Sequence, residues 1–159
     1  MTANMYNMNA QMQNTHHFST HSSDERTWAT LAHASALLNL FGGVGGIIAA
    51  LVIWLTQREK SAWVGFQALQ SLIFQAAAVV ITVLVVGGVW VVGFIVSFAT
   101  IGIGTFVAVP VMILFFFGGF ALMAAEMVYA CYGAYQINQG REFRYKWIGD
   151  WLQRRSVGN

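Results

Sequence analysis

Charged side chains are scarce in this chain of 159 residues: Asp, Glu, Lys and Arg make up 9% of it, against roughly a quarter in an ordinary soluble domain. From Ser61 to Ala125 there is no charged residue at all, and the first one to follow is Glu126. About 20 apolar residues already cross a bilayer as a helix, so this run is too long for a single span. The composition therefore excludes a soluble globular protein and predicts an all-α integral membrane protein.

Cysteine and proline each occur only once. A single cysteine, Cys131, excludes a disulfide framework, and its apolar surroundings predict a buried, inert thiol. The first charges are Asp24, Glu25 and Arg26, so the basic start of a cleavable signal peptide is missing. No hydrolytic triad, phosphate-binding loop or metal-ligand cluster is recognisable. The sequence thus predicts a protein that is not an enzyme, with no catalytic residue, cofactor or metal.

Residues 1–27 form a polar N-terminal tail rich in Met, Asn and His. Its methionines and histidines recur at helical spacing, at Met1, Met5, Met8 and Met12 and then at His16, His17 and His21. Thioether and imidazole groups suit copper, whereas flexible methionines also pack on lipid or on a partner protein. No cysteine anchors a copper site here, which favours the second interpretation.

Residues 28–55 predict the first membrane span of a transmembrane helical domain that covers residues 28–140. Trp28 and Trp54 stand at its two ends, where membrane interfaces enrich tryptophan. Small and weakly polar residues recur along one face, where they allow another helix to approach closely. This packing face consists of Ser35, Asn39, Gly42, Gly46 and Ala50. The dense glycines between Gly42 and Gly46 also have the potential to loosen the helix.

His33 lies near the start of this first span. One interpretation is a ligand for a haem or chlorophyll-type metal through the imidazole. The other is a hydrogen bond to a headgroup, a water molecule or a neighbouring helix. A lone histidine favours the second interpretation.

A short polar connection at residues 57–60 leads to a second span, predicted from Val64 to Trp90. Its first half carries polar residues every three or four positions, so this stripe must face protein or water rather than lipid. The stripe consists of Gln67, Ser71, Gln75, Ala78 and Thr82. The pair Gly87-Gly88 predicts a kink or the exit of the span.

The stretch 91–106 stays apolar, and its residues 101–105 predict a turn. Pro110 suits the first turn of a third helix that runs to about Ile137. In a three-span topology, the connection at 57–60 and the C-terminal tail are cytoplasmic and the N-terminus lies on the opposite side. A four-span alternative breaks the chain at the glycine pair and again near the proline. The positions of the basic residues favour three spans.

Glu126 is the one ionisable residue deep in the predicted membrane region. It lies about 16 Å from the cytoplasmic end of the third helix, and Gln75 lies at the same depth on the second. We therefore predict that the two side chains face each other. The pair is either a polar clasp between helices or part of a proton or cation path; the lack of a second ionisable group favours the clasp. Gly119 and Gly133 near this face predict close helix packing.

Residues 141–159 form a basic, aromatic tail that predicts an amphipathic helix lying at the membrane interface. Five basic and two acidic residues give this tail a charge of 5 − 2 = +3, which predicts a cytoplasmic C-terminus. Together with tryptophans at the span ends, aromatic and basic side chains of the tail are the predicted interfacial anchors. These anchors are Trp28, Trp54, Trp63, Trp147, Trp151, Arg144 and Lys146.

Four stretches resemble the sequence motifs of a bacterial family of small membrane domains. They are Leu31–Leu38, the glycine cluster with Ile53-Trp54-Leu55, Phe66–Ser71 and Gly140–Tyr145. The family is the domain of unknown function numbered forty-eight seventy, which is similar to the Tic-twenty-like chloroplast translocon components. Over residues 28–148 the resemblance implies a helical multi-span domain without an established activity or catalytic residue. The chain departs from that pattern at Trp63–Phe66, where members commonly carry a charged or histidine-containing segment.

The sequence favours a structural or accessory subunit of a larger membrane complex. Its expected partners are the lipid bilayer and either other membrane subunits or further copies of the chain, and nucleic acid is not expected because no extended basic surface is present. A small channel or translocon-like pore is the alternative, and a pigment or haem subunit using His33 is the third. The expected location is the bacterial cytoplasmic membrane.

Overall fold

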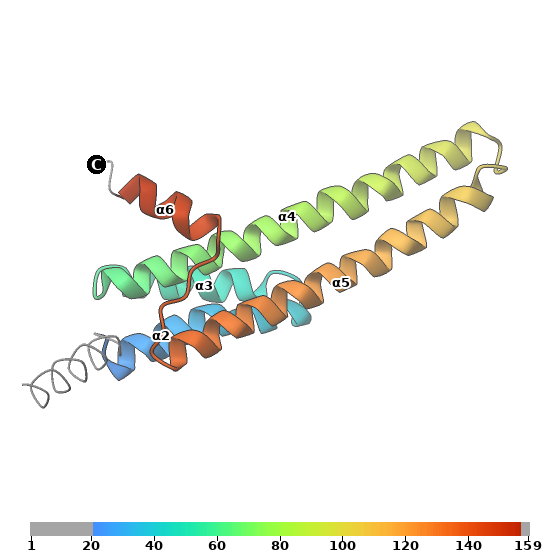
Figure 1. Cartoon of the computed structure of the whole chain (residues 1–159). Coiled ribbons are helices and arrows are strands. Elements are labelled where there is room, and N and C mark those ends of the chain that lie inside the picture. Colours follow the sequence, from blue (N-terminus) through green and yellow to red (C-terminus); the bar gives the residue numbers. More distant parts are fainter. Residues whose placement is uncertain (1–20, 157–159) are drawn as a thin grey trace, which may run out of the picture.

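The structure, a computed structural model, describes residues 21–156, and the elements in this part of the chain are all helical. The helices are α2 (Ser23–Ala34), the 3-10 helix η1 (Ser35–Phe41), α3 (Gly45–Gln57), α4 (Ala62–Ala99), α5 (Thr105–Asn138) and α6 (Ile148–Ser156), as Figure 1 shows. The prediction of an all-α fold is confirmed for these residues. The methionines and histidines of the polar tail that precede His21 lie outside the described residues.

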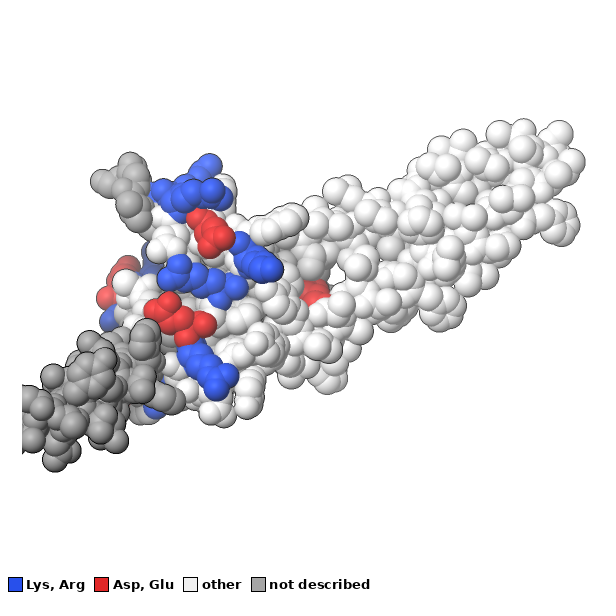
Figure 2. Space-filling view, viewed as in Figure 1, with Lys and Arg blue, Asp and Glu red and all other residues white. Residues whose placement is uncertain are grey.

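The molecule has a broad end and a narrow end. Helices α4 and α5 form a long antiparallel hairpin, and α2, η1, α3 and α6 gather around only one end of it (Figure 1). We call residues 76–125 the arm and the remaining described residues the head. The arm contains no charged residue, and the charges visible in Figure 2 concentrate on the head. Both α4 and α5 are long and apolar enough to cross a membrane.

Helix α4 runs without a break through Gly87 and Gly88 and ends only at Ala99. The predicted kink at the glycine pair is therefore wrong, and so is the four-span alternative that depends on it. In an apolar solvent the backbone groups have no water to bond, so glycine keeps its helical hydrogen bonds. The predicted turn is confirmed: Ile101 and Gly102 adopt positive φ angles of 54° and 89° and reverse the chain.

Helix α5 begins at Thr105, so Pro110 lies inside it rather than in its first turn. Because Pro110 has no backbone N–H, one helical hydrogen bond is missing at this point. Only the first turn of α5 precedes it. The helix then continues to Asn138, close to the predicted end.

The prediction that residues 28–55 form one span is wrong. Gly42 and Gly43 have positive φ angles of 147° and 78°, a conformation that glycine adopts without steric cost. The chain reverses there, and the Asn39 Oδ1 accepts a hydrogen bond of 2.8 Å from the Gly46 N–H on the returning helix. Helices α2 and α3 therefore form a short hairpin joined by η1 and the glycine turn.

Both ends of this short hairpin lie at the same end of the molecule. The Ser61 hydroxyl, which precedes α4, donates a hydrogen bond of 2.6 Å to the Glu25 carboxylate in the first turn of α2. The predicted three-span topology with its N-terminus opposite the 57–60 connection is consequently wrong. Trp28, near the start of α2, and Trp54, near the end of α3, therefore lie toward the same end of the short hairpin rather than at opposite ends of a span.

The head owes its close packing to small residues. Ala29, Ala32, Ala50 and Ala68 are fully buried between the helices, because alanine lets helix backbones approach closely. Larger side chains then fill the space around them, with Ile53 and Val64 in one cluster and Ile137 and Phe143 in another. The result is a bundle of α2, α3, α4 and α5 that fixes the polar side chains described next.

Candidate functional site

His33 lies at the centre of the head and is fully buried. Its Nε2 is 3.2 Å from the Gln67 Oε1 and its Nδ1 is 3.0 Å from the Tyr145 hydroxyl. The Gln67 Nε2 donates to the Phe143 carbonyl, so its Oε1 must be the atom that accepts from His33. The Nε2 therefore carries the ring proton, and the Nδ1 accepts from Tyr145. With both nitrogens engaged, His33 is a core residue with no nitrogen left for a haem or metal.

Gln70 holds the segment that connects α5 to α6. Its Nε2 donates to the Phe143 carbonyl at 3.2 Å, and its Oε1 accepts from the Tyr145 N–H at 3.3 Å. The Phe143 ring also lies directly on Gly133, where a Cβ would come within 2.5 Å of the ring carbon Cε1. These contacts hold the segment between α5 and α6 against both α4 and α5. They fix the position from which α6 starts.

A second polar layer lies one helical turn deeper and joins η1 and α3 to α4. The Gln75 Nε2 donates to the hydroxyls of Ser35 at 3.2 Å and Ser71 at 3.1 Å. Its Oε1 accepts from the Asn39 Nδ2 at 3.2 Å, and the Ser35 hydroxyl also donates to the Gly46 carbonyl at 3.1 Å. The polar stripe on α4 thus faces protein, and its partners come from the short hairpin.

Glu126 does not pair with Gln75, contrary to the prediction. The Gln75 amide points toward η1 and α3, which occupy the other side of α4, and its hydrogen bonds are used there. The Glu126 side chain is buried, and its Oε1 has no hydrogen-bond partner among the described residues. It lines a hollow of about 380 Å³ together with Phe74, Thr82 and Tyr129. A clasp between Glu126 and Gln75 is therefore absent from this arrangement.

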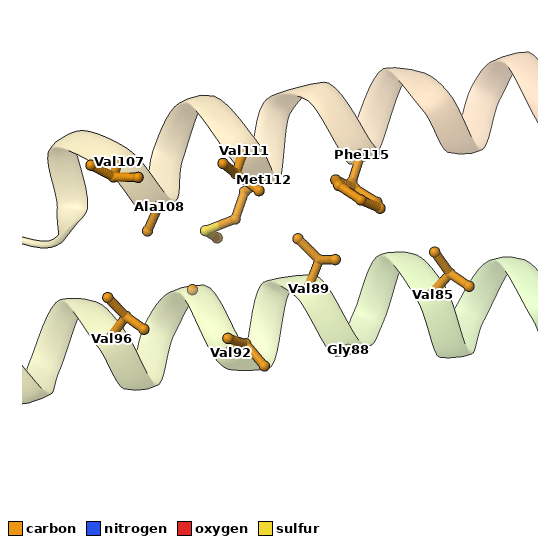
Figure 3. Close-up of a pocket in the computed structure, with 11 residues that line it drawn as sticks. Val85, Gly88, Val89, Val92, Val96, Val107, Ala108, Val111, Met112 and Phe115 are labelled. Carbon is orange, nitrogen blue, oxygen red and sulfur yellow. The ribbon is translucent and has the colours of Figure 1, made fainter.

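The arm contains an apolar groove between α4 and α5. Its volume is about 580 Å³, and Figure 3 shows that valine, methionine and phenylalanine side chains line it, without a polar side chain among those drawn. Closer to the head, Gly119 packs on α4, where an added Cβ would lie 3.0 Å from a methyl of Val86. A groove of this composition offers apolar contact and no group for acid-base or nucleophilic chemistry.

The predicted packing glycines divide into two kinds. Gly46, Gly119 and Gly133 lie against other elements, whereas a Cβ on Gly42 would meet no atom within 4 Å. Gly42 serves the turn instead, through its positive φ angle. Ser35, Asn39 and Ala50 of the same stripe are buried, as expected of a packing face.

Sequence reasoning missed the roles of Gln70, Phe143 and Tyr145. Gln70 follows Gln67 by three residues, a spacing that places both on one face of α4, and this signal could have added it to the stripe. Tyr145 gave no such signal, because it lies among basic residues that predict an interface. The neighbouring anchors Arg144, Lys146, Trp147 and Trp151 are exposed.

The described part of the chain contains no group of three or more His, Cys, Asp or Glu side chains placed to hold a metal ion. His21, the last histidine of the predicted copper segment, stacks on the Trp63 ring with centroids 3.9 Å apart. It also lies 3.9 Å from the Glu25 carboxylate. The other members of that segment lie outside the described residues.

Comparison with known proteins gives one family. The MamF/MmsF family, described as the magnetosome magnetite crystal formation protein family, matches residues 24–152. This match covers the whole arm and all but a few terminal residues of the head, and it overturns the resemblance to the family numbered forty-eight seventy and to the Tic-twenty-like proteins. No curated protein and no solved structure matches the chain.

Proposed function

We infer the function from the premise that this chain belongs to the MamF/MmsF family of magnetosome magnetite crystal formation proteins. We propose that it is a magnetosome membrane protein that supports crystal formation as a non-enzymatic accessory subunit. The observation that carries this proposal is the use of the head's polar side chains. The buried side chains of His33, Gln67 and Gln70 bond to one another, to Tyr145 or to backbone. Gln75 bonds to the side chains of Asn39, Ser35 and Ser71, so all four hold the helices of the head together.

We further propose that the head faces the cytoplasm. The loop at 57–60 and the tail from Arg141 onward contain seven of the eight basic residues, and both belong to the head. Short flanking segments rich in Lys and Arg are retained on the cytoplasmic side. The tip of the arm, around Ile101, then lies on the far side of the membrane.

Extraction of the native protein in a mild detergent tests the accessory role. We expect the protein to migrate in an assembly much larger than its own 17.5 kDa, with other membrane subunits identified by mass spectrometry. A small assembly made of this chain alone would contradict the proposal. The size of the magnetite crystals in cells that lack the protein provides the second readout, and we expect it to change.

A pore or proton path is the second candidate, and Glu126 is the observation that favours it. Burying a carboxylate without a partner costs free energy in an apolar environment, and such a residue often marks an ion or proton path. Purified protein in liposomes with a pH-sensitive dye inside tests this. The accessory role predicts no proton flux above empty liposomes for the native chain or for Glu126→Gln. Flux in the native chain that Glu126→Gln abolishes would establish the second candidate instead.

A further inference from the structure

The short hairpin of α2, η1 and α3 has an apolar face that no part of the head covers. Leu40 is 64% and Phe41 87% exposed at its turn, and Ile48 and Val52 on α3 are more than half exposed. From Thr27 to Gln57 the hairpin carries no Asp, Glu, Lys or Arg. An exposed apolar patch of this kind marks a membrane or protein contact.

The hairpin reaches only a short distance along α4. Asn39 and Gly46, which flank its turn, lie beside Gln75, and Gln75 is 12 residues beyond Trp63. At 1.5 Å per residue these flanking residues are about 18 Å deeper than Trp63, and α4 then continues for about 37 Å to Thr100. Figure 1 shows the same relation, with η1 ending part-way along the long hairpin.

Tryptophans mark the level from which these depths are counted. Trp54 and Trp63 pack against the same cluster of buried residues, and Trp28 lies near the start of α2. Tryptophan is enriched at membrane interfaces. The charged loop at 57–60 lies directly beyond this belt, which identifies the belt as the headgroup level on the head side.

The lengths then fix how deep each element lies. From Trp63 to Thr100 the chain along α4 measures about 55 Å, and a bilayer with its headgroups is about 40–45 Å thick. A tilt of about 40°, the upper end of the observed range, reduces 55 Å to about 42 Å. The same tilt brings the residues that flank the turn of the short hairpin to about 14 Å, which falls short of the midplane at about 21 Å.

We propose that the α2–η1–α3 hairpin inserts into one leaflet only, and that the protein is a wedge that prefers membranes whose convex face is on the head side. The near leaflet contains four helical elements (α2 with η1, α3, α4 and α5), whereas the far leaflet contains only α4 and α5. The protein therefore takes more area from the near leaflet. Because the outer leaflet of a small vesicle is the expanded one, the head fits the outside of such a vesicle. This inference rests on the proposed membrane location but not on the accessory role.

Single cysteines test the depth of the hairpin. In a Cys131→Ala background, Lys60→Cys, Phe41→Cys and Ile101→Cys report the head side, the hairpin turn and the arm tip. In membrane vesicles we expect a membrane-impermeant maleimide to label Lys60→Cys from one side and Ile101→Cys from the other. Phe41→Cys should react only after detergent is added. Labelling of Phe41→Cys together with Ile101→Cys would show that the hairpin spans, and labelling together with Lys60→Cys would show that it stays outside; either result overturns the proposal.

Orientation in vesicles of different size tests the wedge. The Lys60→Cys variant is reconstituted into small and large vesicles of phosphatidylcholine and phosphatidylglycerol, and the fraction labelled from outside is measured. We expect an excess of outward-facing heads in small vesicles, at least about twofold above the ratio in large ones. Equal ratios would overturn the wedge while leaving the depth result intact. Neither experiment uses assembly partners, so failure here is distinct from failure of the accessory role.

Discussion

Gly46 lies where three oxygen atoms converge on α3. A Cβ at this position would collide with the Ser35 carbonyl and the Gln75 Oε1 and would lie 2.8 Å from the Asn39 Oδ1. We expect Gly46→Ala to lower the free energy of unfolding by about 1–3 kcal/mol, because overpacking a tight contact forces its neighbours apart. Denaturant unfolding of the protein in detergent micelles, followed by circular dichroism, measures the change.

Gly87→Ala is the matched control for this substitution. Gly87 lies inside α4, and a Cβ there would meet no atom within 4 Å. Alanine has the higher helix propensity, so the control should leave stability unchanged or slightly raised. Equal losses in the two variants would contradict the close contact at Gly46.

Tyr145 gives a second prediction at the residue scale. Its hydroxyl donates to the Nδ1 of His33, 3.0 Å away and fully buried. Tyr145→Phe removes that donor and leaves a buried acceptor unpaired, at a cost of about 1–3 kcal/mol. Limited trypsin digestion should then cut faster after Arg144 and Lys146, because the segment is held less firmly. Tyr135→Phe, on an exposed tyrosine of α5, should leave the cleavage rate unchanged.

At the scale of the element, the start of α2 is held in place by Glu25. Its carboxylate accepts from the Ser61 hydroxyl at 2.6 Å and from the Ser22 N–H at 2.9 Å. These hydrogen bonds, with a smaller contribution from His21, hold the pKa of Glu25 below its ordinary value of 4.5. A lowered pKa means that the fold favours the charged form.

The pH dependence follows from that direction. The stabilisation by Glu25 is fully present above pH 4.5 and is lost as the pH falls through the lower pKa of the folded state. We expect the melting temperature to fall in this acidic window, and Glu25→Gln to reduce the fall. Glu59→Gln, on a carboxylate that is largely exposed, is the control and should follow the native curve. An unchanged curve for Glu25→Gln would contradict the tether.

Two glycine pairs show what the sequence could and could not predict about the helices. Gly42-Gly43 and Gly87-Gly88 look alike as letters, yet the first pair reverses the chain and the second continues a helix. The difference lies in their surroundings: Asn39 is placed to bond the returning helix at Gly46, whereas an added Cβ on Gly87 or Gly88 would meet no atom within 4 Å. The turn at Gly102 was predictable because residues 101–105 contain two closely spaced glycines, Gly102 and Gly104.

The candidate site was likewise predictable from the sequence only in part. The stripe of Gln67, Ser71 and Gln75 was predictable from spacing alone, since residues three and four apart share a face. Its partners were not, because they depend on the return of α3 beside α2. The pairing of Glu126 with Gln75 failed for this reason: equal depth on two antiparallel helices says nothing about which side of each helix is already occupied.

At the scale of the whole molecule, the head and the arm are stabilised by different contacts. The head is held by buried hydrogen bonds between side chains, which are stronger in a medium of low polarity. In the arm, α4 and α5 touch through small residues such as Gly93, which receives Met112, and Gly119, which receives Val86. These contacts are apolar and set no angle between the arm and the membrane, so the angle must follow from the apolar length.

That length leads to a prediction about tilt. From Trp63 to Thr100, α4 extends about 55 Å, so in a bilayer about 42 Å thick with headgroups we expect the long helices to tilt by about 40°. In a bilayer about 6 Å thicker, the tilt should fall by about 10°, because a helix of fixed length crosses a thicker bilayer at a smaller angle to the membrane normal. Polarised infrared spectroscopy of oriented bilayers measures the angle, and lipids of equal chain length but different headgroup provide the control. A tilt that stays constant as thickness grows would show that the arm extends beyond the bilayer, with its apolar end covered by another protein.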